Sequence, residues 1–168
     1  MKPVLALDLG TKCGHVFGCP AARIDGVWDL KGGRYEGGGM RFLRFRRNLD
    51  ELHAARPIGE VVYEEVRRHL GTDAAHVYGG LLGQLTAWCE EHGVPYEGVP
   101  VGTIKRWAVG KGNATKDQMI AAMVALGEQP KDDNHADALA LWRLRMDQIA
   151  QRGPAGAASA VSPKRKVA

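Results

Sequence analysis

The chain has 168 residues, of which 45% are hydrophobic and 25% charged, which fits one folded soluble domain and excludes a chain that is disordered throughout. Four of its 23 basic residues lie in residues 151–168, which hold no acid, so the remaining 19 balance the 19 acidic residues and the net charge of +4 comes from the end of the chain. Three cysteines without a C-x-x-C pair exclude a disulfide framework, and the lack of any apolar stretch near the roughly 18 residues of a membrane span predicts a cytoplasmic protein with no membrane partner.

Short apolar runs between turn residues predict strands at residues 3–9, 14–19, 26–30, 58–66 and 94–99. Helical patterns occur at residues 40–56, 72–92, 103–109, 115–126 and 133–151. Residues 20–25 are expected to form a turn and the glycine-rich residues 32–39 a mobile loop, while Thr115 and Gln118 have the spacing of a capping box. This order predicts an α/β fold over residues 1–150, with a mixed sheet flanked by helices, followed by a disordered basic tail at residues 151–168.

Acidic residues stand at the ends of three apolar stretches. Asp8 closes the first predicted strand, and Glu64 follows the apolar run of the fourth. Asp133 and Asp137 open the last helix, and their spacing of four places them on one helix face. A buried carboxylate is costly unless it is paired or binds a cation. Four carboxylates that converge would suit one or two Mg²⁺ or Mn²⁺ ions, an arrangement that serves phosphodiester hydrolysis.

Each acidic feature also has a purely structural interpretation. Asp8 alone could close a strand–turn junction, and either Glu64 or its neighbour Glu65 could simply be solvated. Asp133 could belong to the N-cap of the last helix. The occurrence of all three features in one chain favours the metal site.

Basic residues cluster beside these acids. Arg67 and Arg68 follow closely after the acids of the fourth strand, and four others flank the glycine-rich turn at residues 110–113, namely Lys105, Arg106, Lys111 and Lys116. Free amides at the start of the following helix could receive a phosphate, and such contacts do not depend on base sequence. We interpret these residues as a DNA-binding surface, the alternative being a solvated basic face.

Four segments resemble the motifs of RuvC-type Holliday-junction resolvases. In residues 103–124, Lys105 precedes a G-x-G-x-A-x-K run that ends at Lys116, as in that family. The segments ALDLGTKCG, VVYEEV and NHADALAL are similar to its acidic motifs, in the same order along the chain. The resemblance covers roughly residues 1–144 and is greatest to compact members from phages and prophages.

This resemblance implies an RNase H-like fold with a mixed five-stranded sheet. It also implies a homodimeric, metal-dependent endonuclease that cuts branched DNA such as a four-way junction, with two metal ions and no small-molecule cofactor. Asp8, Glu64 and Asp137 match the catalytic acids of the family, and Lys105 and Lys116 match lysines that engage the DNA backbone near the cut phosphate.

The chain departs from the family pattern at two places. The family has an acid, or in some members a histidine, at the position of Asn134, so the fourth ligand could instead be Asp133, which we expect, or His135. The bacterial members carry an aromatic residue after the second acid, where this chain has residues 67–69, RRH. The preference for a junction, a fork or RNA is therefore left open by the sequence.

Two other functions are compatible with these motifs. One is a nuclease of the same superfamily that processes structured RNA. The other is a module that binds branched DNA without cutting it, which the asparagine at residue 134 favours. Cutting of junction DNA and of RNA in the presence of Mg²⁺ or Mn²⁺ separates the three.

Overall fold

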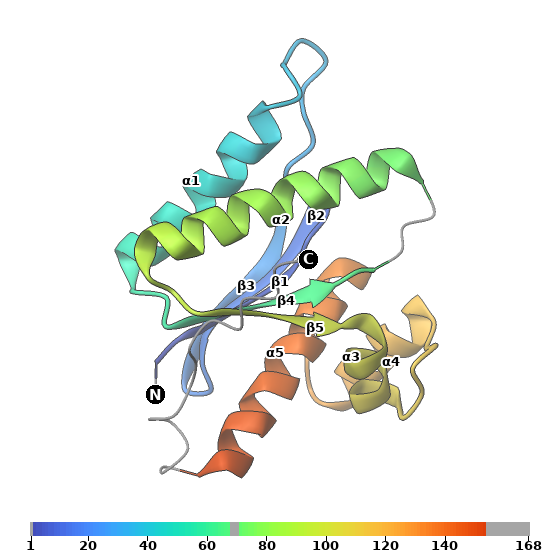
Figure 1. The fold of residues 1–168 in the computed structure, drawn as a ribbon. Coiled ribbons are helices and arrows are strands. Elements are labelled where there is room, and N and C mark those ends of the chain that lie inside the picture. Colours follow the sequence, from blue (N-terminus) through green and yellow to red (C-terminus); the bar gives the residue numbers. More distant parts are fainter. Residues whose placement is uncertain (1, 68–70, 154–168) are drawn as a thin grey trace.

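One mixed sheet of five strands forms the centre of the molecule. In a computed structural model, which describes residues 2–67 and 71–153, the strands lie in the order β3-β2-β1-β4-β5 (Figure 1). β1 is antiparallel to β2 and β2 to β3, whereas β4 is parallel to both β1 and β5. The bounds of the strands are β1 Val4–Asp8, β2 Lys12–Cys19, β3 Ala22–Asp29, β4 Glu60–Glu65 and β5 Tyr96–Pro100. This is the α/β architecture that the sequence predicts.

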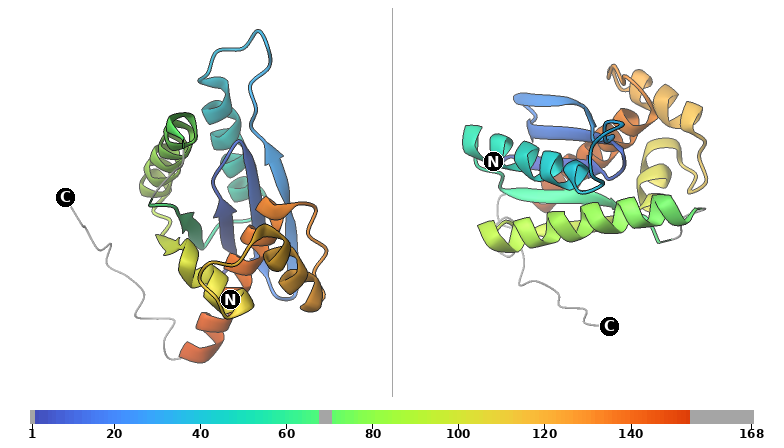
Figure 2. Two further views of the ribbon diagram at one scale, coloured as in Figure 1. Left: turned by 90° about the vertical axis from the view of Figure 1, so that its right-hand side faces the viewer. Right: turned by 90° about the horizontal axis from the view of Figure 1, so that it is seen from above.

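Helices cover both faces of this sheet. α1 (Met40–Ala55) and α2 (Thr72–His92) lie on one face, and α5 (Asp133–Arg152) crosses the other (Figure 2). The two short helices α3 (Val101–Val109) and α4 (Lys116–Ala125) pack beside α5. The sheet therefore separates two cores, one under α1 and α2 and the other under α5.

Alternation along the two central strands decides which side chains face α5. Leu7 belongs to the core under α1 and α2, whereas Ala6 belongs to the core under α5. Because side chains alternate with a period of two, Asp8 points to the α5 face like Ala6. On β4, Val62 lies in the core under α5, which places Glu64 on that face as well. One face of the sheet thus carries both acids.

The observed helices and strands follow the predicted ones closely, and one predicted turn is wrong. β3 begins at Ala22, which pairs with Cys19 across a two-residue turn, so the turn expected at residues 20–25 is wrong. Arg23 and Asp25, which fall inside the expected turn, form an ion pair with each other on this edge strand. The capping box is confirmed, because Thr115 Oγ1 accepts a hydrogen bond from the Gln118 amide and the Gln118 side chain accepts one from the Thr115 amide.

The last helix ends close to the point where the sequence predicts the disordered tail to begin. α5 continues to Arg152, one residue beyond the predicted helix end, and residues 154–168 lie outside the described residues. Within residues 2–67 and 71–153, no helix combines the length and the apolar character that a membrane span requires.

An ionic network fixes the segment that leads into α5. The Glu128 carboxylate, which is 5% exposed, binds Arg23 of β3 and Arg143 of α5. Burial raises the pKa of Glu128, but the hydrogen bonds from both arginines outweigh it, so the pKa is lowered overall. The network connects the edge of the sheet to α5 and so helps to set the position of that helix.

Replacing Glu128 by glutamine is expected to lower the free energy of unfolding by about 2 kcal/mol, because two partly buried arginines lose their counter-charge. Since the folded-state pKa is lowered, this stabilisation is present above the ordinary glutamate pKa of 4.5 and is lost as the pH falls through the folded-state value. Urea unfolding at pH 7 and pH 4 measures both effects. Glu51→Gln, at an exposed ion pair with Arg47, is the control and should cost less than about 0.5 kcal/mol. Equal losses for the two variants would contradict the role of the network.

Candidate metal centre

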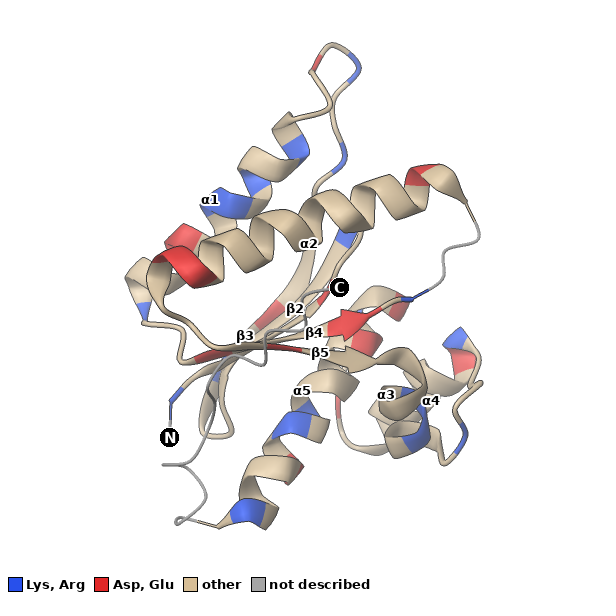
Figure 3. Cartoon of the chain, viewed as in Figure 1, with Lys and Arg blue, Asp and Glu red and all other residues tan. Residues whose placement is uncertain are grey.

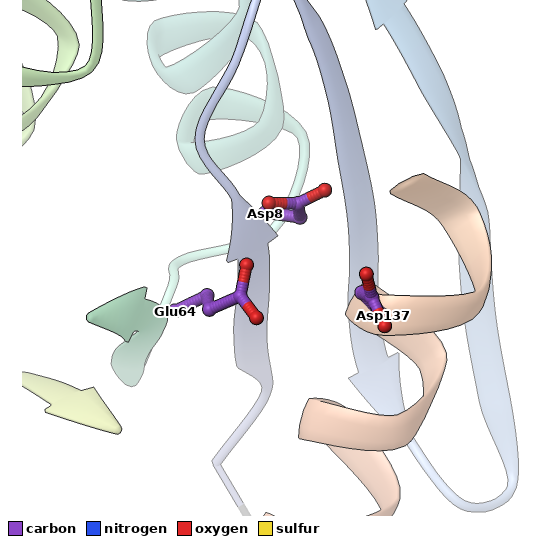
Figure 4. Close-up of side chains that lie close together, drawn as sticks. All are labelled: Asp8, Glu64 and Asp137. Carbon is purple, nitrogen blue, oxygen red and sulfur yellow. The ribbon is translucent and has the colours of Figure 1, made fainter. Parts of the chain in front are cut away.

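Three carboxylates from separate elements meet on the α5 face of the sheet. Asp8 ends β1, Glu64 lies near the end of β4, and Asp137 lies in the first turns of α5 (Figure 4). One oxygen from each of the three lies within 4.8 Å of the others. These are three of the four acids that the sequence singled out as metal ligands.

The register of the parallel pair β1 and β4 brings the first two acids together. Leu7 pairs with Tyr63, so the next residues along the two strands are Asp8 and Glu64. Both side chains lie on the α5 face, and Figure 4 shows their carboxylates directed toward the same space. Glu65 points to the opposite face and accepts hydrogen bonds from Arg67 at 3.2 and 3.3 Å. Glu64 is therefore the glutamate of this pair that reaches the site.

Gly14 allows the third acid to reach the other two. This residue of β2 pairs with Asp8 across the strands, and the first turn of α5 lies directly on it. A Cβ added to Gly14 would lie 2.0 Å from the backbone oxygen of Asn134 and 3.2 Å from the Cβ of Ala138. The bare backbone of β2 thus permits the close approach of α5 that carries Asp137 over the end of β1.

The start of α5 is fixed from its own side as well. The side chain of Asp132 caps the helix by accepting a hydrogen bond from the His135 amide at 2.9 Å. The His135 ring is buried: its Nδ1 accepts a hydrogen bond from the Lys131 amide at 3.1 Å, and its Nε2 lies 3.1 Å from Asp25 Oδ1. Both ring nitrogens therefore lie beside groups other than the three carboxylates, and His135 is not part of the group that those carboxylates form.

Burial and mutual repulsion disfavour the charged forms of the three acids. Burial raises the pKa of Asp8 well above its ordinary range, and the neighbouring Glu64 raises it further. Burial likewise raises the pKa of Glu64, and burial together with Glu64 raises the pKa of Asp137 to about 7. Among the described residues, Asp137 Oδ1 is a buried oxygen without a hydrogen-bond partner. A hard divalent cation fits these three oxygen donors, because its positive charge would stabilise the ionised forms that burial and mutual repulsion disfavour.

Asp133, the fourth predicted ligand, lies outside this group. Its carboxylate forms a salt bridge with Lys116 of α4, which lowers the pKa of Asp133 and raises that of Lys116. Asn134 contributes its backbone oxygen to the contact with Gly14. The structure thus brings together three of the four predicted acids, with the fourth held by a predicted DNA-binding lysine.

The predicted DNA-binding residues lie around the acids to different extents. Lys105 of α3 is near enough to lower the pKa values of Glu64 and Asp137. Arg106 and Lys111 are exposed on α3 and the following turn, and Figure 3 shows the basic residues of α3 and α4 beside the acidic end of β4. Arg67 is exposed next to Glu65, and Arg68 lies outside the described residues. Lys105 and Lys116 are thus the predicted DNA-binding residues whose charges act on the acids in the described structure.

The sequence reasoning assigned no role to Gly14, although it is part of the ALDLGTKCG segment. A glycine inside a predicted strand is a signal for close approach of another backbone, and this signal was present. The approaching segment, however, is 120 residues further along the chain, and only the fold identifies it.

Comparison with known proteins assigns the family. No protein-family model matches the chain. The crossover junction endodeoxyribonuclease RuvC of Halorhodospira halophila is 31% identical to it over 146 residues, which are 83% of this chain and 87% of that protein. The chain belongs to the RuvC family.

Solved structures agree with this assignment of the chain to the RuvC family. RuvC from Thermus thermophilus superposes with a TM-score of 0.65 at 28% identity, over 86% of this chain and 96% of that one. A T. thermophilus RuvC in complex with a Holliday junction substrate gives 0.69 at 21% identity, over 87% and 98%. The yeast mitochondrial Holliday junction resolvase Ydc2 gives 0.57 at 13% identity, over 88% and 81%, and these last two likenesses show the shared fold. The RNase H-like fold expected for a RuvC family member is thereby confirmed.

Proposed function

We propose that this RuvC family member is a metal-dependent endonuclease that hydrolyses phosphodiester bonds in branched DNA, with four-way junctions as substrate. The observation that carries the proposal is the convergence of Asp8, Glu64 and Asp137 within 4.8 Å, at a site where burial disfavours their ionised forms. The relative in Halorhodospira halophila is named as a crossover junction endodeoxyribonuclease, which supports the same reaction.

The three carboxylates are the proposed metal ligands, with Mg²⁺ or Mn²⁺ as the ion. When bound, one or two such ions would supply a more acidic water and would stabilise negative charge on the phosphate oxygens. Asp133 is proposed as a further acid of the site, available once Lys116 turns from it to a DNA phosphate. The pairing of these two residues keeps the carboxylate charged and in place.

The basic residues are proposed to hold the DNA backbone over the acids. Lys105 lies beside Glu64 and Asp137, where its ammonium could contact the phosphate to be cut. Arg106, Lys111 and Lys116 continue this surface along α3 and the start of α4, and Arg67 extends it past β4. Arg68 is proposed to contribute as well, from outside the described residues. Contacts of this kind act through charge, so binding should weaken steeply with salt.

A homodimer is the proposed active form. Resolving a four-way junction requires two cuts in strands related by the symmetry of the junction, and one chain holds one cluster of three acids in its described part. Two copies related by a two-fold axis would place one site on each strand.

The proposed function is tested with a labelled four-way junction, a linear duplex of matching sequence and a structured RNA, each incubated with Mg²⁺, Mn²⁺ or EDTA. The proposal predicts paired nicks in the junction with either metal, none in EDTA, and little cutting of the duplex or the RNA. Binding of the junction without cutting in any metal would instead favour a non-catalytic binding module. Preferential cutting of the RNA would favour the RNA-processing function.

A further inference from the structure

The loop between β3 and α1 presents an aromatic side chain to solvent. Tyr35 is 93% exposed, more than any other large apolar side chain that the structure describes. The guanidinium of Arg34 lies 5.7 Å from the centre of its ring. An exposed aromatic ring does not contribute the favourable free energy that burial of its apolar surface normally gives to folding. The position therefore suggests a ring kept available for a partner.

Hydrogen bonds within the loop hold this arrangement. Arg44 of α1 donates to the backbone oxygen of Lys31 at 3.2 Å and forms a salt bridge with Glu36. The Glu36 carboxylate also accepts from the Gly33 amide at 2.6 Å. The polar groups around Tyr35 are thus tied to one another and to α1, whereas the ring itself remains in solvent.

The base of this loop lies at the edge of the sheet that carries the acids. β3 and β1 are both antiparallel to β2 and therefore end at the same edge. The Leu30 amide, at the start of the loop, donates to the backbone oxygen of Thr11 at 2.8 Å, and Thr11 is three residues beyond Asp8. Arg41, at the other end of the loop, lines a hollow of about 440 Å³ together with Leu9, Gly10 and Thr11. The base of the loop thus lies at the same edge of the sheet as the acids, while the loop itself extends beyond α1 (Figure 1).

The charge of this region is positive and largely uncompensated. Lys31, Arg34 and Arg41 form no salt bridge with any residue of the described chain. Figure 3 shows further basic residues along the loop and α1, on the opposite side of the sheet from the basic residues of α3 and α4. A polyanion held at the acids could therefore extend across the sheet edge onto this second basic surface.

We propose that Tyr35 stacks on an unpaired base at the branch point of the DNA, while Arg34 and Lys31 bind the adjacent phosphates. Every base has a flat π face, so stacking on an aromatic side chain needs no particular sequence. Bases inside a linear duplex are already stacked on each other, whereas a branch point can expose one. The loop would thus distinguish branched from linear DNA, and this inference rests on the proposed function.

The test measures binding without cutting, in EDTA. A four-way junction and a linear duplex, each with the fluorescent base 2-aminopurine at the position of the branch point, are titrated with the protein. For the unmodified protein, the fluorescence of the junction should change on binding. Tyr35→Ala should remove this change and weaken junction binding by about 5- to 50-fold, from the known contribution of base–aromatic stacking, while duplex binding stays within about twofold.

Two variants serve as controls. Tyr35→Phe keeps the ring and should behave as the unmodified protein. Leu43→Ala removes another exposed apolar side chain, 61% exposed on α1, and should change neither signal. If Tyr35→Ala binds and reports on the junction as the unmodified protein does, the inference is wrong while the proposed function stands. If the unmodified protein neither binds nor cuts the junction, the proposed function and the inference both fail.

Discussion

Replacing Asp137 by asparagine is expected to abolish DNA cutting and, at the same time, to stabilise the metal-free protein. The loss of activity should be at least about 1000-fold, because a ligand that contributes several kcal/mol of transition-state stabilisation through the metal is removed. The gain in stability should be about 1–2 kcal/mol at pH 8, since the amide takes the place of a buried carboxylate that is forced to ionise.

The sign of this stability change follows from the pKa of Asp137. Its ordinary value is 3.8 and its value in the folded protein is about 7, so between these two pH values the folded state binds more protons than the unfolded state. The free energy of unfolding of the metal-free protein should therefore fall as the pH rises from about 4 to 7, and the contribution of Asp137 should level off above pH 7. The asparagine variant lacks this fall.

Thermal unfolding with and without Mg²⁺ or Mn²⁺ measures the change in stability, and cutting of a labelled four-way junction measures the change in activity. Metal should raise the melting temperature of the unmodified protein more at pH 8 than at pH 5.5, because protons compete with the cation for the carboxylates. It should raise that of Asp137→Asn little at either pH. Asp147→Asn, on the exposed part of α5, is the control and should retain both cutting and the metal effect. If metal-free Asp137→Asn is less stable than the unmodified protein at pH 8, the ionised Asp137 carboxylate does not destabilise the folded state, and the prediction is wrong.

Replacing Gly14 by alanine should disable the site through geometry alone. The new Cβ would lie 2.0 Å from the Asn134 backbone oxygen and 2.6 Å from its carbonyl carbon, and neither is the end of a flexible side chain. The first turns of α5 must therefore move away from β2 and take Asp137 with them. We expect a loss of about 2–3 kcal/mol in the free energy of unfolding, typical of overpacking. Cutting should fall by about 100-fold or more where the protein remains folded, since a misplacement near 1 Å has that effect.

Gly26→Ala provides a matched control on the neighbouring strand β3. There an added Cβ would contact the end of the flexible Lys131 side chain at 3.3 Å and the His15 ring at 3.4 Å. The loss of stability should stay below about 1 kcal/mol and cutting should be retained, as expected for a small change that neighbours can accommodate. Urea unfolding and junction cutting at a temperature at which both variants are folded make the comparison. Full activity of Gly14→Ala would contradict the proposed placement of α5.

Local patterns were sufficient for most of the fold because each element carries its own signals. The capping box at Thr115 and the glycine after His92 fix helix ends through contacts within a few residues. The turn expected at residues 20–25 was too long, because β3 begins at Ala22 and includes Arg23 and Asp25. Arg23 is stabilised within the strand by Glu128, a partner 105 residues away that no local pattern reveals.

The candidate site was predictable to the extent that acids at strand ends meet at one edge. The sequence placed acids at the ends of both strands, but only the resemblance to the RuvC family selected Glu64 over Glu65, and the observed register of β1 and β4 brings Asp8 and Glu64 together. The pairing of Asp133 with Lys116 was not predictable, because it depends on how α4 packs against the start of α5. The engagement of His135 by Asp25 likewise depends on the approach of α5 to β3.

The most direct test of the three-carboxylate centre compares two adjacent glutamates. Glu64→Gln and Glu65→Gln make the same chemical change at neighbouring positions of β4, one facing Asp8 and the other facing Arg67 on the opposite side of the sheet. Their rates of four-way junction cutting in Mg²⁺ are measured alongside junction binding in EDTA. We expect Glu64→Gln to bind the junction without cutting it, and Glu65→Gln to cut within a fewfold of the unmodified rate. An active Glu64→Gln protein, or an inactive Glu65→Gln protein that still binds the junction, would contradict the three-carboxylate centre.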